Sequence, residues 1–131
     1  MANVLFVCLQ NAGRSQMSEA LFNATAGGRH TARSAGSAPA AHVHPEVVAV
    51  MRELGIDLRD RTPKPITREL AEWADVVVTM GCGDACPYVP GTRYVDWDLP
   101  DPSGRGVDEV RALRDEIGRR VTELLATLDG A

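Results

Sequence analysis

The 131-residue sequence lacks the features that would place it in a membrane, on nucleic acid or outside the cell. No apolar run approaches the roughly 18 residues that a transmembrane helix requires. The opening MANVLFVC has neither the basic start nor the longer apolar stretch of a signal peptide, so we expect a cytoplasmic protein. The net charge of −4 and the pI near 5.3 favour neither nucleic acid nor a membrane surface as a partner.

Cysteine is scarce, with only Cys8, Cys82 and Cys86. An odd number of cysteines in a chain without a signal peptide argues against a structural disulfide framework. Zinc needs four ligands, and the sequence has no second C-x2-C pair, nor do His42 and His44 form an ordered ligand pair. We therefore expect no bound metal, which leaves buried thiols or redox chemistry.

The apolar pattern predicts an α/β fold. The predicted strands are Asn3–Cys8, His30–Ala35, Asp75–Met80 and Arg93–Val95, and the predicted helices begin after Ser15 as a cap, at Pro45, after Thr67 as a cap, and near Val110. This order predicts one domain over residues 1–131, a three-layer sandwich with a four-stranded parallel sheet and helices on both faces. The carboxyl ends of such strands form the functional edge of the sheet.

The first predicted strand runs directly into CLQNAGRS, a C-x5-R-S motif that precedes a helix. A loop of this length can turn its backbone N–H groups inward as an anion nest, and the helix start adds the positive end of its dipole. Arg14 offers a planar fork for a tetrahedral oxyanion, with Cys8 at the bottom of the nest. The expected substrate-binding residues are Leu9, Gln10, Asn11, Ala12, Gly13 and Arg14.

The same field is expected to make Cys8 a nucleophile. A free thiol is only a few per cent ionised at neutral pH, and the thiolate is the reactive form. Ser15 is expected to hydrogen-bond to the sulfur, and Asn11 to hold the shape of the loop. The alternative is a buried structural cysteine beside a surface arginine. The nest suits phosphate and arsenate alike, so it does not choose between them.

The loop after the last predicted strand reads WDLPDPSG and offers a general acid. A positioned carboxylic acid can protonate the oxygen that leaves the anion, and Pro102 restricts the local backbone. On composition either Asp98 or Asp101 serves, and a plain Pro-Asp turn is an equal alternative.

Residues 81–87 read GCGDACP and place Cys82 and Cys86 four positions apart. A disulfide between them needs Cα atoms within roughly 7 Å, which one turn of chain can provide. A phosphatase needs the nest and the acid but no further thiols, whereas a nucleophilic cysteine with a dithiol can supply two electrons by thiol–disulfide exchange. Two unrelated thiols remain the alternative.

Taken together, these motifs resemble the arsenate reductases that share the low-molecular-weight tyrosine phosphatase fold. The resemblance covers nearly the whole chain, in the segments VLFVCLQNAGRSQMSEA, RSAGS, HPEVVAVMRELGIDL, ADVVVTMGCGDACP and YVDWDLPDPSG. The first and last segments are shared in outline with the phosphatases. The MGCGDACP segment is typical of the reductases and carries most of the functional inference.

The resemblance implies a three-cysteine relay that reduces arsenate to arsenite. Cys8 attacks arsenate, and Asp101 rather than Asp98 aids the loss of oxygen. Cys82 then attacks Cys8 and arsenite leaves, after which Cys86 attacks Cys82 and the resulting disulfide is reduced by thioredoxin. This implies no bound cofactor, with arsenate and thioredoxin as partners of an expected monomer.

The resemblance also assigns supporting roles around the nest. Arg14 and Ser15 match its anion-binding and thiolate-stabilising positions. The positions that shape the loop are Asn11, Glu19 and Ser34, which in some family members surround a potassium ion. Lys64 stands where those members carry an acidic residue, so we expect its ammonium group to take the place of the ion.

Three other functions are compatible with parts of the pattern. A tyrosine phosphatase would use the same nest, but Ser103 and Gly104 follow the Asp-Pro where such phosphatases carry aromatic residues. A second kind of arsenate reductase uses a low-molecular-weight thiol such as mycothiol in place of Cys82 and Cys86. A non-catalytic oxyanion or metalloid sensor could use the three thiols for binding, although no DNA-reading element supports it.

Overall fold

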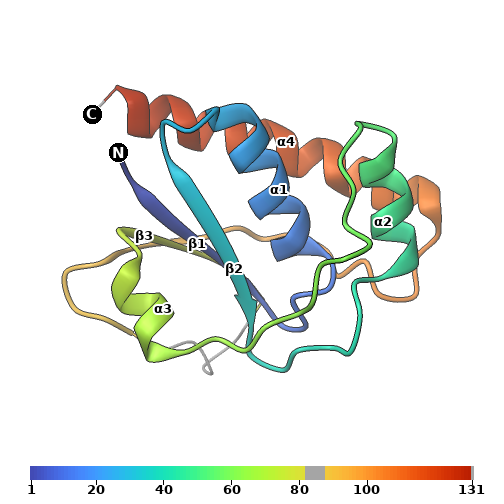
Figure 1. Ribbon diagram of the computed structural model, residues 1–131, viewed down its shortest axis with the longest axis horizontal. Coiled ribbons are helices and arrows are strands. Elements are labelled where there is room, and N and C mark those ends of the chain that lie inside the picture. The colour runs from blue at the N-terminus through green and yellow to red at the C-terminus, as the bar shows by residue number, and fades with distance from the viewer. Residues whose placement is uncertain (82–87, 131) are drawn as a thin grey trace.

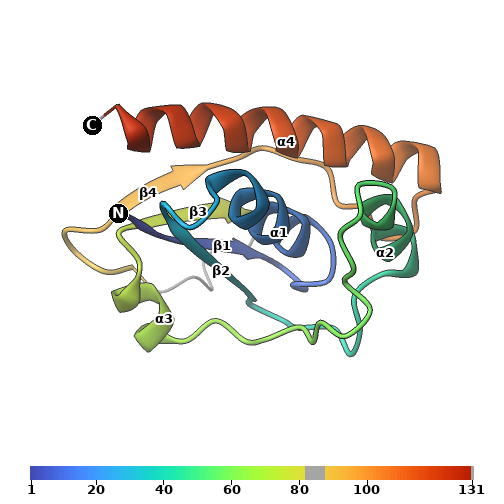
Figure 2. The ribbon, with the colours of Figure 1, turned by 45° about the horizontal axis from the view of Figure 1, so that its top comes forward.

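The structure is a computed structural model that describes residues 1–81 and 88–130. Its strands are β1 (Asn3–Cys8), β2 (Thr31–Gly36), β3 (Val76–Met80) and β4 (Arg93–Asp96), and its helices are α1 (Arg14–Ala26), α2 (Pro45–Arg52), α3 (Arg68–Trp73) and α4 (Val107–Asp129). The strands pair in parallel in the order β2-β1-β3-β4. Helices α1, α2 and α4 cover one face and α3 the other (Figures 1 and 2), which confirms the predicted sandwich.

Strand β1 lies inside the sheet and sends apolar side chains to both faces. Val4 and Phe6 belong to the larger core under α1, α2 and α4, whereas Leu5 and Val7 belong to the smaller core that α3 covers. Burial on both faces explains why this strand reads as a continuous apolar run. In contrast, β4 is an edge strand whose residues are half-buried or exposed, because a neighbour pairs with only one of its sides.

The helix starts partly follow the predicted caps. The Oγ1 atom of Thr67 accepts a hydrogen bond from the backbone N–H of Leu70 at 3.1 Å, so Thr67 caps α3 as predicted. The prediction that Ser15 caps α1 is wrong, because Gly13 holds that position and Ser15 lies inside the first turn. The Ser15 hydroxyl is used elsewhere, against the sulfur of Cys8.

The strand ends meet at one edge of the sheet, as predicted. Cys8, the last residue of β1, is in register with Gly36 of β2 and with Met80 of β3. The loop that follows β4 brings Asp101 to the guanidinium of Arg14 at the same edge. Within the described residues, no helix is both long enough and apolar enough to cross a membrane.

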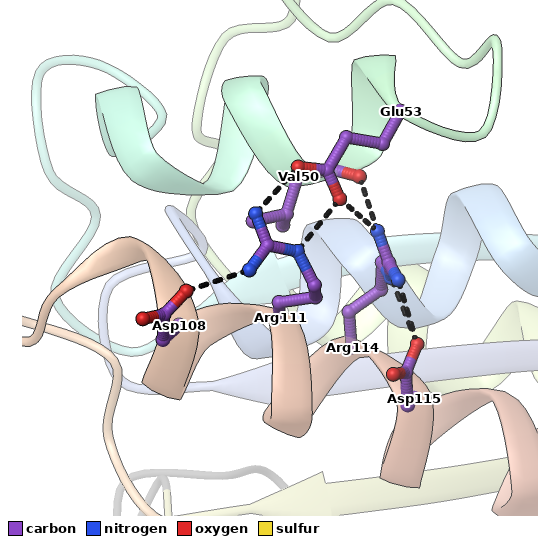
Figure 3. Close-up of polar contacts among 6 residues, drawn as sticks. All are labelled: Val50, Glu53, Asp108, Arg111, Arg114 and Asp115. Carbon is purple, nitrogen blue, oxygen red and sulfur yellow. Dashed lines mark hydrogen bonds and ion pairs between the residues drawn. The ribbon is translucent and has the colours of Figure 1, made fainter.

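A group of charged residues joins α2 to α4 on the side of the sheet that α1 also covers (Figure 3). The Glu53 carboxylate accepts hydrogen bonds from Arg111 at 2.9 and 2.7 Å and from Arg114 at 2.8 Å. Arg114 is buried and also donates to the carbonyl oxygen of Val50 at 2.8 Å. Hydrogen bonds from Arg111, reinforced by Arg114, lower the pKa of Glu53 to about 2.

Glu53→Gln is therefore expected to lower the Tm at neutral pH and to flatten the acid limb of the stability profile. Because the pKa of Glu53 is depressed in the folded state, its contribution is complete above the unfolded value near 4.5 and is lost as the pH falls towards about 2. Thermal unfolding followed by circular dichroism between pH 7 and pH 2 measures both effects.

The matched control is Asp57→Asn. The pKa of Asp57 is also lowered to about 2, chiefly by hydrogen bonds from Arg59. That pair spans two residues of one loop and can form in the unfolded chain as well, so it should contribute little to folding. Equal losses of Tm in the two variants would contradict the role of Glu53 in joining the helices.

Candidate active site

The loop between β1 and α1 is held from outside by residues 37–44, which we call the strap. Four backbone N–H groups of the strap donate to carbonyl oxygens of the loop, from Ser37 to Cys8 (3.2 Å), Ala38 to Leu9 (2.7 Å), Ala40 to Gln10 (2.9 Å) and His44 to Ala12 (3.0 Å). In a trans peptide the carbonyl group and the next N–H point in opposite directions. The N–H groups that follow these carbonyls therefore turn inward, which is the arrangement of an anion nest.

The sulfur of Cys8 is buried at the bottom of the nest and has two polar contacts. The backbone N–H of Asn11 donates to it at 3.3 Å, and the Ser15 hydroxyl lies 2.9 Å away. Because the Asn11 side chain already donates to the Ser15 oxygen at 2.7 Å, the hydroxyl hydrogen is available to the sulfur. Two hydrogen-bond donors are therefore directed at the sulfur at the bottom of the nest.

Asn11 adopts a left-handed backbone with φ of 51°, a conformation that asparagine tolerates better than most residues. Its Oδ1 atom accepts from Gln16 Nε2 at 3.1 Å and from the backbone N–H of Lys64 at 2.9 Å. A backbone N–H can only donate, so the oxygen of the amide faces Lys64 and the nitrogen faces Ser15. The direction of the hydrogen-bond chain to the sulfur is thereby set.

Arg14 is a buried guanidinium held at one side of the nest. Its Nη1 donates to the carbonyl oxygen of Leu99 at 3.2 Å, and its Nη2 lies 3.8 Å from the carboxylate of Asp101. Its Nε is buried and has no hydrogen-bond partner within residues 1–81 and 88–130. A Cβ on Gly81 would lie 3.0 Å from Nη1, so glycine leaves room for this side chain. One guanidinium N–H is thus available to an oxyanion.

Asp101 stands at the rim of the nest, with its side chain 45% exposed. Its Oδ1 accepts from the backbone N–H of Ser103 at 2.9 Å. The next residue, Pro102, packs so closely on Gly13 that a Cβ there would lie 2.5 Å from the proline ring. Asp98 is exposed, and in the described part of the chain no ion pair joins it to Arg14. Of the two candidate acids, Asp101 is the one beside the nest.

The carboxylate of Glu19 lies behind the nest and meets a different cation from the one expected. Its Oε1 accepts from the Ser34 hydroxyl at 2.9 Å, and its Oε2 pairs with Arg61. The prediction that the Lys64 ammonium group lies beside Glu19 is wrong. Lys64 is exposed, and it supports the loop through its backbone, because its extended N–H and C=O groups face Asn11 and the end of β2.

The surroundings of Glu19 do not fit a potassium ion. Both of its carboxylate oxygens are engaged, and the Arg61 guanidinium already supplies the positive charge. Elsewhere in residues 1–81 and 88–130, no group of three or more His, Cys, Asp or Glu side chains could hold a metal ion.

Several site residues were not found from the sequence, and two predicted ones lie outside the described residues, namely Cys82 and Cys86. The strap was missed because its bonds to the loop are made by backbone atoms, which leave no residue-type signal. Arg61 was missed although a buried Glu19 requires a positive partner. Gly36 was quoted only within RSAGS, yet its backbone lies against the loop.

Gly36→Ala is expected to distort the nest and to weaken oxyanion binding by more than about tenfold. A Cβ at this position would lie 2.8 Å from both the Asn11 nitrogen and the Leu9 oxygen, which are backbone atoms and cannot rotate away. Overpacking of this kind costs about 1–3 kcal/mol of stability. Isothermal titration with phosphate and thermal unfolding measure the two effects.

Gly118→Ala is the matched control, because a Cβ there meets nothing within 4 Å and the residue lies inside α4. It is expected to leave phosphate binding unchanged and to stabilise the protein by about 0.5–1 kcal/mol. Unchanged phosphate affinity in Gly36→Ala would show that the close approach of Gly36 to the loop does not shape the nest.

This fold is that of the phosphatase-like α/β proteins. Residues 3–86 match the model of the low molecular weight phosphotyrosine protein phosphatase family, and the chain belongs to this family.

Relatives of two kinds lie close to the chain. The thioredoxin-dependent arsenate reductase of Corynebacterium glutamicum superposes with a TM-score of 0.87 at 42% identity over 98% of this chain, which spans 62% of that one. The glutaredoxin arsenate reductase of Synechocystis is 36% identical over 98% of this chain and 99% of its own length. The YwlE arginine phosphatase of Geobacillus stearothermophilus has a TM-score of 0.85 at 25% identity, covering 99% and 94% of the two chains.

Proposed function

We propose that this protein reduces arsenate to arsenite through Cys8, Cys82 and Cys86, with thioredoxin as the reductant. The observation that carries the proposal is the buried Cys8 sulfur, which accepts two hydrogen bonds at the bottom of a nest. Beside it lies an Arg14 Nε–H that has no partner among the described residues. Relatives named arsenate reductase at 36–42% identity support the substrate. Gly81, which directly precedes Cys82 in the sequence, lies against Arg14.

The proposed reaction balances in two electrons. The Cys8 thiolate forms an S–As bond while one arsenate oxygen, protonated by Asp101, leaves as water. The Cys82 thiolate then attacks the Cys8 sulfur, the S–As bonding pair passes to arsenic, and arsenite leaves. Cys86 attacks Cys82, which frees the Cys8 thiolate and leaves a Cys82–Cys86 disulfide. An external dithiol returns that disulfide to two thiols.

Thioredoxin is the favoured reductant because the relay ends in a disulfide within the chain. A dithiol protein reduces such a disulfide through one mixed disulfide and resolves it with its own second thiol. The two reductases above carry the names of different reductants, thioredoxin and glutaredoxin. NADPH oxidation with arsenate in a thioredoxin system and in a glutathione–glutaredoxin system tests the choice. If arsenate were reduced with the glutathione–glutaredoxin system but not with the thioredoxin system, thioredoxin would be the wrong reductant, and the three-cysteine relay would still stand.

Cys86→Ser is expected to permit one turnover and to block the second. Cys8 and Cys82 can still release one equivalent of arsenite, but the disulfide between them has no internal thiol to resolve it. Arsenite released per protein should therefore approach one, and peptide mapping after thiol blocking should find Cys8 joined to Cys82. Undiminished steady-state turnover with thioredoxin would remove Cys86 from the relay.

Hydrolysis of phosphate monoesters is a second candidate function, because it needs only the nest and the acid. The match of residues 3–86 to the phosphotyrosine protein phosphatase family model favours some activity of this kind. A variant with both Cys82→Ser and Cys86→Ser separates the two functions. It should keep any hydrolysis of p-nitrophenyl phosphate and lose catalytic arsenate reduction.

A further inference from the structure

A buried carboxylate lies behind the nest, on the same helix as the residue that contacts the nucleophile. Glu19 follows Ser15 by one turn of α1, a rise of about 6 Å, and its side chain is only 6% exposed. A buried carboxylate is costly unless it is paired and hydrogen-bonded. Ser34 supplies a hydrogen bond, and Arg61, whose side chain is 40% exposed, reaches in from the loop before α3 to supply the charge.

The segment that carries Arg61 contacts the nest at a second point. Three residues later, the backbone N–H of Lys64 donates to Asn11 Oδ1 at 2.9 Å. The Lys64 carbonyl accepts from the N–H of Gly36 at 2.8 Å, and the Ile66 N–H donates to the Gly36 carbonyl at 2.9 Å. Arg61 therefore belongs to a segment that is also bonded to the asparagine whose amide orients Ser15 towards the sulfur.

We propose that Arg61 is a positioning residue for the nucleophile: its pairing with Glu19 removes a negative charge from behind the Cys8 thiolate and the bound oxyanion, and it holds the Lys64 backbone against Asn11. Arg61 itself touches neither the sulfur nor the residues of the nest in the contacts described above. The inference rests on the nucleophile assigned in the proposed function, but it does not depend on arsenate being the substrate.

The electrostatic part of this role has a definite size. In general, two unit charges about 10 Å apart at an effective dielectric constant of about 20 interact strongly enough to change a rate or a binding constant by about tenfold. An unpaired Glu19 carboxylate would act against the thiolate and against a bound oxyanion, since both are negative. Removal of the Arg61 charge should therefore slow reactions of the sulfur and weaken anion binding together.

The experiment compares Arg61→Met, Arg61→Lys and the control Arg59→Met in the full-length protein. Arg59 lies two residues earlier, is exposed and pairs locally with Asp57. Its removal makes the same change in net charge and leaves the Glu19–Arg61 pair in place. Alkylation of Cys8 by iodoacetamide at pH 7 is followed by mass spectrometry of the Cys8 peptide, and phosphate affinity is measured by isothermal titration. In Arg61→Met, alkylation of Cys8 should be about tenfold slower and phosphate should bind more weakly. In Arg61→Lys and Arg59→Met, the alkylation rate and the phosphate affinity should stay near those of the unmodified protein.

A second change separates the charge from a general loss of packing. In the double variant Glu19→Gln with Arg61→Met, no unpaired carboxylate remains, and the alkylation rate should return most of the way. If Arg61→Met does not fold, Arg61→Gln keeps a hydrogen-bond donor for Glu19 and carries the same expected slowing. The proposal would be overturned if Arg61→Met matched Arg59→Met in alkylation rate and phosphate affinity. It would also be overturned if the double variant were alkylated as slowly as Arg61→Met. Neither readout uses arsenate or thioredoxin, so failure of the proposed function would leave them unaffected.

Discussion

Replacing Cys8 by serine is expected to abolish arsenate reduction while oxyanion binding survives. The nest consists of inward-facing backbone N–H groups and the Arg14 guanidinium, and none of these is removed. A serine hydroxyl is not ionised at neutral pH and forms no disulfide, so both the attack on arsenic and the relay are lost. Loss of a nucleophile lowers turnover by on the order of 10⁴-fold or more. Thioredoxin-coupled NADPH oxidation measures turnover, and isothermal titration with phosphate measures binding.

The converse variant, Arg14→Met, is the control for this result. It keeps the thiol and removes the guanidinium, so phosphate affinity should fall sharply while iodoacetamide should still alkylate Cys8. If Cys8→Ser reduced arsenate at a substantial rate, the nucleophile would have to lie elsewhere. If Cys8→Ser lost phosphate binding as well, the sulfur would be part of the binding site and not only of the chemistry.

Asp101→Asn is expected to slow the first chemical step by about 10²–10⁴, the usual cost of a missing general acid. The carboxylate lies 3.8 Å from the Arg14 guanidinium, so it faces the place where an oxyanion would sit. Asparagine can still accept the hydrogen bond from the Ser103 N–H, so the loop should keep its shape. Rapid-quench measurement of arsenite formed in a single turnover isolates this step, and phosphate affinity should change little.

Asp98→Asn is the matched control, because it makes the same change from carboxylate to amide three residues earlier in the same loop. Asp98 is exposed between the buried residues Trp97 and Leu99, so it points away from the core that they enter. Its replacement should leave the single-turnover rate within a few-fold of the unmodified protein. If Asp98→Asn lowered the single-turnover rate more than Asp101→Asn did, the assignment of Asp101 as the general acid would be wrong.

The site illustrates how backbone and side-chain contacts from distant segments complete a local motif. The C-x5-R-S loop supplies the sulfur, the amides and the arginine, but the strap turns the amides inward, and the carbonyl of Leu99 holds the guanidinium. The hydrogen-bond chain from the Lys64 N–H through Asn11 and Ser15 then reaches the sulfur. The strap and Lys64 both lie in the connection between β2 and β3, and Leu99 lies in the connection after β4.

The sequence alone was sufficient for the features that depend on neighbours along the chain. The apolar run Asn3–Cys8 predicted an inner strand, because a strand buried on both faces needs apolar residues at every position. The C-x5-R-S spacing predicted the nest, since five intervening residues suffice to curl a loop around an anion. The order of strands and helices predicted the sandwich and the edge at which Cys8 and the acid loop meet.

Only the tertiary structure decided the contacts between residues far apart in sequence. Arg61 rather than Lys64 pairs with Glu19 across 42 positions. Asp101, which the family resemblance but not the residues alone favoured over Asp98, lies beside Arg14. Local patterns report which residue types stand on one face of an element, but not how far a side chain or a proline-rich loop reaches across the fold. Lys64 offers its backbone because Pro63 and Pro65 favour an extended segment beside Gly36, and this leaves the longer reach into the interior to Arg61.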